Sequence, residues 1–202
     1  MIKYFFTLTL ILLFFFPSSV GARVYLDITS PIFVQIPIVL PQWKSVDKTS
    51  PTLSAKVYEI LTNDLTLSGF FRVIDFHHLP PHLQQREGIP NKLSIKEWIS
   101  TDGEILLVGE TSLEKESLNL RLKFHLFDLV EQKHLVGKQY EGHLQNLRKM
   151  AHRIADEVIL QLTGEKGVHN TKIAYATLQG ESKEIFIADF DGANMKQITQ
   201  TQ

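Results

Sequence analysis

The chain has 202 residues, of which 44% are hydrophobic, so it is long enough to bury one substantial core and part of a second. Its 21 Lys and Arg residues nearly balance its 22 Asp and Glu residues, and the resulting net charge of −1 argues against a nucleic-acid partner. Because the sequence contains no cysteine, thiol catalysis and thiolate metal sites are excluded.

Residues 1–22 predict a secretory signal peptide. Lys3 precedes a short apolar run, and Pro17 and several small residues follow it. Val20 and Ala22 stand at the −3 and −1 positions of a cleavage site, so the mature chain is expected to begin at Arg23. A retained membrane anchor is the less favoured alternative, since the run is shorter than the ~20 residues that cross a bilayer.

The next two segments predict strands. Residues 23–28 alternate apolar and polar side chains, the pattern of a half-buried strand. The residues concerned are Arg23, Val24, Tyr25, Leu26, Asp27 and Ile28. A second strand is expected within residues 32–41, at a sheet edge or broken there, because Pro37 cannot donate a ladder hydrogen bond.

Two long helices are predicted. The first is expected to start at Ser50 and Pro51, favourable N-cap and first-turn residues, and to stop at Gly69. Its apolar face should comprise Leu53, Val57, Ile60, Leu61 and Leu65. The second should span residues 144–162 and stop at Gly164. Its inner face should comprise Leu144, Leu147, Ala151, Ile154, Val158 and Leu162.

Between the helices, strands are predicted over residues 70–76, 104–110, 118–129 and 133–142, with a loop at 77–92 and a short helix at 94–99. Residues 104–110 should be buried on both faces, because their apolar residues run without alternation. In residues 118–129 one face is apolar, and His125 is expected to be solvated on the other. The apolar face should comprise Leu118, Leu120, Leu122, Phe124 and Leu126.

Together these elements predict an α/β domain: a two-layer mixed sheet with two long helices and one exposed polar sheet face. After Gly164 the pattern changes to short strands at residues 172–178 and 184–190, joined by a polar turn. A domain boundary is therefore expected within residues 164–171.

The sequence offers two candidate metal sites, and both are disfavoured. His77, His78 and His82 form the one histidine cluster, but Pro80 and Pro81 forbid the helix that would bring two of them together, so a solvated loop is expected. Asp189 and Asp191 are spaced like the first ligands of a calcium loop. Gln200 stands where the closing glutamate should be, so a hairpin turn with Asp191-Gly192 at positive φ is favoured.

No catalytic or cofactor-binding motif is present. The sequence lacks a G-x-S-x-G elbow, a phosphate-binding glycine loop, an H-E-x-x-H helix and a G-x-G-x-x-G turn. We therefore expect no enzymatic activity, no cofactor, no metal and no small-molecule substrate.

Five stretches, in order, resemble the TolB family, the soluble periplasmic components of the Tol-Pal cell-envelope system of Gram-negative bacteria. They are "PIFVQIPIVLP", "ILTNDLTLSGFFRVID", "WISTDGEILLVGE", "LRKMAHRIADEVILQLTGEKGVHNTKIAY" and "IADFDGANMKQIT". The most specific are the D-L-x-x-S-G-F-F pattern of Asp64 to Phe71 and the sequence "LTGEKGVHNTKIAY". The resemblance runs from Arg23 to the end of the chain.

The resemblance implies a domain at residues 23–164 followed by a six-bladed β-propeller built from W-S-P-D-G repeats. No such repeat occurs, and six blades of about forty residues each would not fit. Residues 165–202 are therefore expected to be the first strands of an incomplete propeller. The chain is expected to be truncated, which places the family's contact with the lipoprotein Pal in doubt.

By the same resemblance, the chain is expected to act as a periplasmic, non-catalytic scaffold in outer-membrane integrity and in division. Its partner would be a TolA-like inner-membrane protein, to whose sheet edge residues 23–28 could add as a strand. Pairing of this strand within its own domain is an equal alternative. Two other hypotheses stay open: a non-functional product of a truncated or split gene, and an unrelated exported hydrolase or sugar-binding module.

Overall fold

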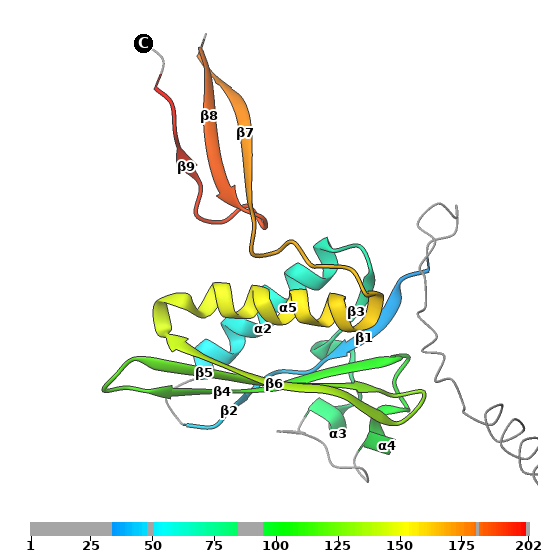
Figure 1. The fold of residues 1–202 in the computed structure, drawn as a ribbon. Coiled ribbons are helices and arrows are strands. Elements are labelled where there is room, and N and C mark those ends of the chain that lie inside the picture. Colours follow the sequence, from blue (N-terminus) through cyan, green and yellow to red (C-terminus); the bar gives the residue numbers. More distant parts are fainter. Residues whose placement is uncertain (1–33, 48–50, 85–94, 181, 201–202) are drawn as a thin grey trace, which may run out of the picture.

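The computed structural model describes residues 34–47, 51–84, 95–180 and 182–200. Within them the chain forms a six-stranded sheet with helices on it, followed by a three-stranded sheet that projects away from the long helices (Figure 1). No helix in these ranges is long and apolar enough to cross a membrane. The predicted signal peptide, residues 1–22, and the predicted strand at residues 23–28 lie outside the described residues.

The larger sheet is mixed, as predicted. Its order is β3-β1-β4-β5-β6, with β2 paired to β4. β1 runs parallel to β3 and β4, whereas β4, β5 and β6 are antiparallel. The strands are β1 (Ile36–Leu40), β2 (Lys44–Ser45), β3 (Phe71–Asp75), β4 (Ile105–Glu114), β5 (Asn119–Asp128) and β6 (Lys133–His143).

Pro37 lies in an inner strand of this sheet, so the prediction of an edge or broken strand is wrong. Successive N–H groups of a strand point to opposite neighbours. The N–H of Ile36 donates to the Phe70 carbonyl on the β3 side at 2.9 Å, so the nitrogen of Pro37 faces β4. Pairing with β4 begins only at Ile38. The proline therefore costs no ladder hydrogen bond, and its carbonyl accepts one from the Glu104 N–H at 2.9 Å.

Helix α2 (Pro51–Leu67) buries the face that its periodicity predicts. Val57, Leu61 and Leu65 are fully buried against the sheet and α5. The helix ends where expected, because Gly69 takes a φ of +75°, a conformation that favours glycine.

Helix α5 (Leu147–Thr163) lies beside α2 on the same face of the sheet (Figure 1). A short 3₁₀ turn, η2 (Leu144–Asn146), precedes it, so the α-helix begins later than the predicted residue 144. Gly164 caps its end at a φ of +77° and donates its N–H to the Leu160 carbonyl at 3.0 Å.

The main core lies between the two long helices and the sheet. β5 supplies alternate residues to it, and Leu120, Leu122 and Phe124 are fully buried, which confirms the predicted alternation. Burial of each such side chain contributes about 1.5–3 kcal/mol. Leu118 is an exception, because it lies in the turn before β5 with a φ of +51° and is 41% exposed.

The opposite face of the sheet is only partly polar, contrary to the prediction. Two short helices, α3 (Pro81–Gln84) and α4 (Ile95–Trp98), cover one end of it and form a second, smaller core (Figure 1). Its buried members are Val39, Leu79, Leu83, Ile95, Trp98, Leu106, Val108, Phe127 and Leu129. β4 is thus buried on both faces, as predicted. His125 is half-buried rather than solvated, because its ring stacks on that of Phe127.

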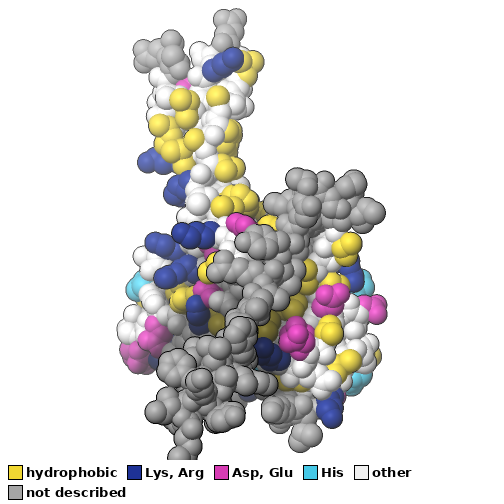
Figure 2. All heavy atoms as spheres, turned by 45° about the vertical axis from the view of Figure 1, so that its right-hand side comes forward, with side chains coloured by type: hydrophobic (Ala, Val, Ile, Leu, Met, Phe, Trp, Pro, Cys, Tyr) yellow, Lys and Arg dark blue, Asp and Glu magenta, His cyan; other side chains and the backbone are white. Residues whose placement is uncertain are grey.

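The second sheet is formed by β7 (Lys172–Gln179), β8 (Ser182–Asp189) and β9 (Lys196–Gln197) in antiparallel order. Both of its faces carry apolar side chains. On one face Tyr175 stacks on Phe186, and on the other Ala176 pairs with Ile185. Figure 2 shows hydrophobic side chains along this projecting sheet. Three strands alone do not define a propeller, so that assignment stays a prediction.

Candidate functional site

The candidate residues from the sequence do not come together. Residues 23–28 lie outside the described residues. His77 and His78 lie in η1 (Phe76–His78) and His82 lies in α3, and all three side chains are exposed. The side chain of Asp75 caps η1 by accepting the His77 N–H at 2.8 Å. The prolines thus permit two short helical turns where a loop was expected, but no helix joins His78 to His82.

Asp189 and Asp191 lie at the turn between β8 and β9, which pair as the predicted hairpin. The positive φ angles fall at Gly192 (+83°) and Asn194 (+52°), not at Asp191. The Asp189 carboxylate accepts hydrogen bonds from the Lys172 ammonium at 2.6 Å and from the Asn194 side chain. Protein donors therefore occupy both oxygens of this carboxylate.

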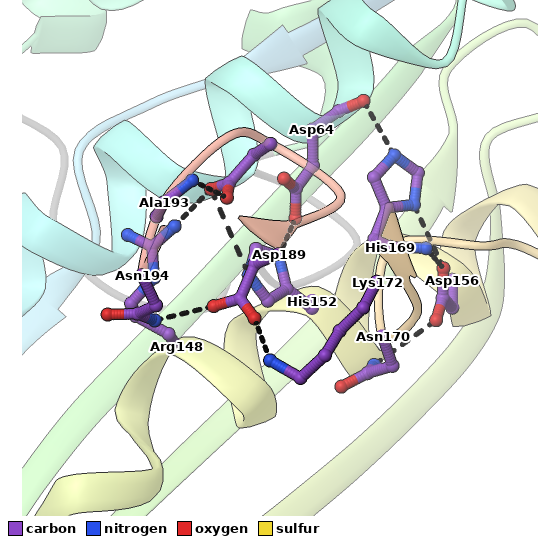
Figure 3. A network of polar contacts seen from close by, with 11 residues as sticks. Asp64, Arg148, His152, Asp156, His169, Asn170, Lys172, Asp189, Ala193 and Asn194 are labelled. Carbon is purple, nitrogen blue, oxygen red and sulfur yellow. Dashed lines mark hydrogen bonds and ion pairs between the residues drawn. The ribbon is translucent and has the colours of Figure 1, made fainter. Parts of the chain in front are cut away.

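A polar network joins this turn to α2 and α5, and we describe it as the junction (Figure 3). It comprises Asp64, Arg148, His152, Asp156, His169, Asn170, Lys172, Asp189, Asp191 and Asn194. Its residues come from both long helices, from residues 164–171 between α5 and β7, which we call the linker, and from β7 and the hairpin of β8 and β9. The network thus lies between the two parts of the chain.

The centre of the junction is a buried carboxylate–imidazole pair. Asp64 lies near the end of α2 and is fully buried, and His152 on α5 is buried with it. The Asp64 Oδ2 atom and the His152 Nδ1 atom lie 2.6 Å apart. The side-by-side packing of α2 and α5 brings these residues together, so the pair ties one helix to the other.

Arg148 and Asp191 connect α5 to the hairpin. The Arg148 guanidinium donates to Asp191 Oδ2, and His152 Nε2 lies 3.9 Å from the same oxygen. The other oxygen of Asp191 accepts the N–H of Ala193 at 3.1 Å, which holds the turn in shape. The hairpin therefore reaches the helix pair through one carboxylate that is only 6% exposed.

His169 connects the linker to both helices. Its Nδ1 atom lies 2.9 Å from Asp156 Oδ1 on α5, and its Nε2 atom lies 3.0 Å from the Asp64 carbonyl near the C-terminal end of α2. Burial opposes the charged imidazole, but the hydrogen bond with Asp156 and the nearby Asp64 raise the pKa of His169. A protonated imidazole can donate at both positions, and a helix C-terminus favours a cation.

Asp156 is held by three donors of the linker. Besides the imidazole, the His169 N–H donates to it at 2.9 Å and the Asn170 side chain at 3.2 Å. Burial opposes the charged carboxylate, yet these hydrogen bonds lower the pKa of Asp156. Gly167 allows this approach, because a Cβ atom there would lie 2.6 Å from the Asp156 Cα atom. The linker is therefore fitted closely to α5.

The junction could be a metal site only at its centre. One ligand atom from each of Asp64, His152 and Asp191 lies within 4.8 Å of the others. However, the Arg148 guanidinium contacts the Asp191 oxygen nearest to the imidazole, and a fixed positive charge there repels a cation. The polar side chains of the junction pair with one another, so the arrangement fits a structural link between the helices and the three-stranded sheet better than a metal centre.

Pattern reasoning missed most of these residues. Asp64 lies in the apolar row of α2 between Leu61 and Leu65, and His152 lies beside Ala151 on the inner side of α5. A polar side chain among buried positions is the one available signal, because buried polar groups need partners. The apolar periodicity of the two helices did not single out either residue.

Comparison with known proteins matches residues 24–135 to the family of TolB amino-terminal domains. A relative named Tol-Pal system protein TolB, from Syntrophotalea carbinolica, is 31% identical over 196 residues, which are 96% of this chain and 45% of the relative. A protein of the same name from Desulfosudis oleivorans is 30% identical over 200 residues, and the match covers 96% of this chain and 44% of the relative. The chain thus spans less than half the length of these relatives.

A solved structure gives the same fold. The crystal structure of TolB from Acinetobacter baumannii matches with a TM-score of 0.64 at 20% sequence identity. The match covers 81% of this chain and 38% of that chain.

Proposed function

The chain belongs to the family of TolB amino-terminal domains, and from this premise we propose that it is a non-catalytic component of the Tol-Pal system that acts through protein contacts. Its setting would be the periplasm, reached with the signal peptide of residues 1–22 removed after Ala22. Its role would lie in outer-membrane integrity and in the invagination of the envelope at division.

One observation carries this proposal: the junction fixes an apolar sheet to the α/β domain. The sheet of β7 to β9 exposes large apolar side chains on both faces, with Ile173 at 41% and Ile185 at 45% exposure. Monomeric proteins seldom expose such surfaces unless another protein covers them. The buried ionisable groups of the junction are engaged with one another, which suits a scaffold better than an enzyme.

The same sheet supports the proposal that residues 165–202 are the first strands of a β-propeller. A blade packs between two neighbouring blades and therefore needs two apolar faces. Tyr175 and Phe186 would face one neighbour, and Ile185 with Leu178 the other. Residues 23–164 would form the domain that precedes it.

We further propose that residues 23–28 contact a TolA-like protein by adding a strand to its sheet edge. Alternating side chains would enter pockets while the main chain forms the hydrogen bonds. The contact with a Pal-like lipoprotein belongs to the propeller of the family and is not assigned to this chain.

The test measures the affinity of the purified protein for the soluble domain of TolA by calorimetry. Deletion of residues 23–28 should abolish binding. Replacing the three apolar residues Val24, Leu26 and Ile28 by serine should weaken binding at least tenfold. The matched control, in which serine replaces Arg23, Tyr25 and Asp27, should weaken binding less. If the variant that lacks residues 23–28 binds the TolA domain with unchanged affinity, this contact is refuted. Absence of binding by the intact protein would refute the broader proposal.

A further inference from the structure

A pair of histidines lies on the sheet face that the long helices do not cover. His125 of β5 points to this face, because its neighbours Phe124 and Leu126 are buried on the other. Along β6 the pairing passes from Val136 to His134, with a bulge that skips one residue. A bulge redirects the side chains that follow it. Here it places His134 opposite Phe127, on the same face as His125.

The imidazole rings of His125 and His134 are in contact, and neighbouring residues hold them in place. The His125 Nδ1 atom and the His134 Nε2 atom lie 2.9 Å apart and form a hydrogen bond in which one ring donates and the other accepts. The ring of Phe127 flanks both, with centroids 6.2 Å from His125 and 4.9 Å from His134. Gly137, directly opposite His125, makes room, because a Cβ atom there would lie 2.7 Å from the His125 ring and 3.2 Å from His134 Nε2. The two rings can therefore approach each other because Gly137 has no side chain to occupy the space between them.

The separation of the two nitrogen atoms fits two ligands of one metal ion. Metal–imidazole bonds are about 2.0–2.1 Å long, so two such bonds at a right angle place their nitrogen atoms about 2.9 Å apart. Right angles are typical of square-planar or tetragonal Cu²⁺ and Ni²⁺, whereas the tetrahedral angle of Zn²⁺ requires a wider separation.

The two imidazoles differ in how open they are to solvent. The His125 Nε2 atom is buried without a hydrogen-bond partner in the described residues, so His125 can bind a metal only through Nδ1. A metal ion bound there would replace the hydrogen bond between Nδ1 and His134 Nε2. His134 is exposed, which leaves the metal's remaining positions to water.

We propose that His125 and His134 bind one divalent transition-metal ion, with Cu²⁺ preferred over Ni²⁺ and Zn²⁺. The order follows the general affinity of nitrogen sites for these metals and the right-angled geometry of the pair. This surface site is separate from the junction and does not depend on the proposed Tol-Pal role.

The test titrates Cu²⁺ into the purified protein, prepared without a histidine tag, and follows binding by calorimetry and by electron paramagnetic resonance. The wild-type protein should bind one Cu²⁺ whose spectrum shows coupling to two imidazole nitrogens. His134→Ala should weaken binding at least tenfold and remove one of the two couplings. Gly137→Ala, which keeps both histidines but crowds His125, should also weaken it.

His82→Ala is the matched control, because it removes an exposed histidine of the "HHLPPH" segment and should leave both affinity and spectrum unchanged. Circular dichroism of each variant verifies folding. The proposal fails if wild-type protein does not bind Cu²⁺, if His134→Ala binds like wild type, or if His82→Ala loses the site. An equal affinity for Zn²⁺ and Cu²⁺ would contradict the assigned preference.

Discussion

Replacing His169 by alanine should destabilise the protein strongly, because its ring ties the linker to both long helices. The side chain is 1% exposed and bonds to Asp156 and to the Asp64 carbonyl. Removing one partner of a buried ion pair costs about 3–5 kcal/mol of unfolding free energy. Asp156 keeps two other donors and is 22% exposed, so the lower end applies. We expect a loss of about 3 kcal/mol.

This loss should depend on pH in a defined direction. The pKa of folded His169 is raised above its unfolded value of about 6.5, so its contribution is complete below that pH and is lost as pH rises through the folded pKa. The pKa of folded Asp156 is lowered, so its contribution is complete above about pH 3.9 and is lost as pH falls through the folded pKa. The pair should therefore contribute fully between about pH 4 and pH 6.5.

The assay is urea unfolding of the wild type and of His169→Ala at pH 5.5 and at pH 9. The difference in unfolding free energy should be about 3 kcal/mol at pH 5.5 and should fall toward about 1 kcal/mol at pH 9, where a neutral hydrogen bond remains. His82→Ala is the control and should change little at either pH. A difference below about 1 kcal/mol at pH 5.5, or one that grows with pH, would refute the reasoning.

Three further changes probe the fold at other positions. Asp64→Ala leaves the buried imidazole of α5 without its hydrogen-bond partner and should cost about 1–3 kcal/mol in urea unfolding, whereas an unchanged free energy of unfolding would contradict the buried contact. Gly167→Ala forces a Cβ atom against the Asp156 backbone, so the linker should become accessible to limited proteolysis; unchanged cleavage would contradict that close approach. Arg121→Ala removes an exposed pair with Glu141 at 2.7 Å, and the urea midpoint should change little in the same unfolding assay.

The sequence predicts the elements of this fold well, because their patterns are local. Alternation in β5 and the glycines that end α2 and α5 depend on neighbouring residues alone. The position of β1 in the sheet was harder to predict. A proline is excluded from a central strand only if its nitrogen lies where a neighbouring strand needs a hydrogen-bond donor. Pro37 lies where pairing with β4 has not begun, a fact of register that no local pattern contains.

The second small core was missed for a related reason. Leu79 and Leu83 are isolated apolar residues among prolines and histidines, so their segment resembles a solvated loop. They are buried because Val108 and Phe127 turn apolar side chains toward them from distant strands. Patterns of single elements do not show which faces two elements share.

The junction could be foreseen only in outline. The two stretches that most resemble the family contain Asp64 and His169, but nothing in either stretch pairs them. The Asp64 carbonyl and the His169 ring are separated by 105 positions, and the Asp64 carboxylate and His152 by 88. Tertiary packing alone brings such groups together, so sequence spacing could not assign the site.

The central claim is that the junction holds the three-stranded sheet in a fixed position on the α/β domain. Because the chain has no cysteine, Glu59→Cys on α2 and Thr177→Cys on β7 provide two specific sites for spin labels, both exposed. The distance between the labels, measured by pulsed electron paramagnetic resonance at pH 6, should give one narrow distribution that broadens when Asp191→Ala removes the contact with Arg148. A broad distribution in the protein with an intact junction would contradict the claim.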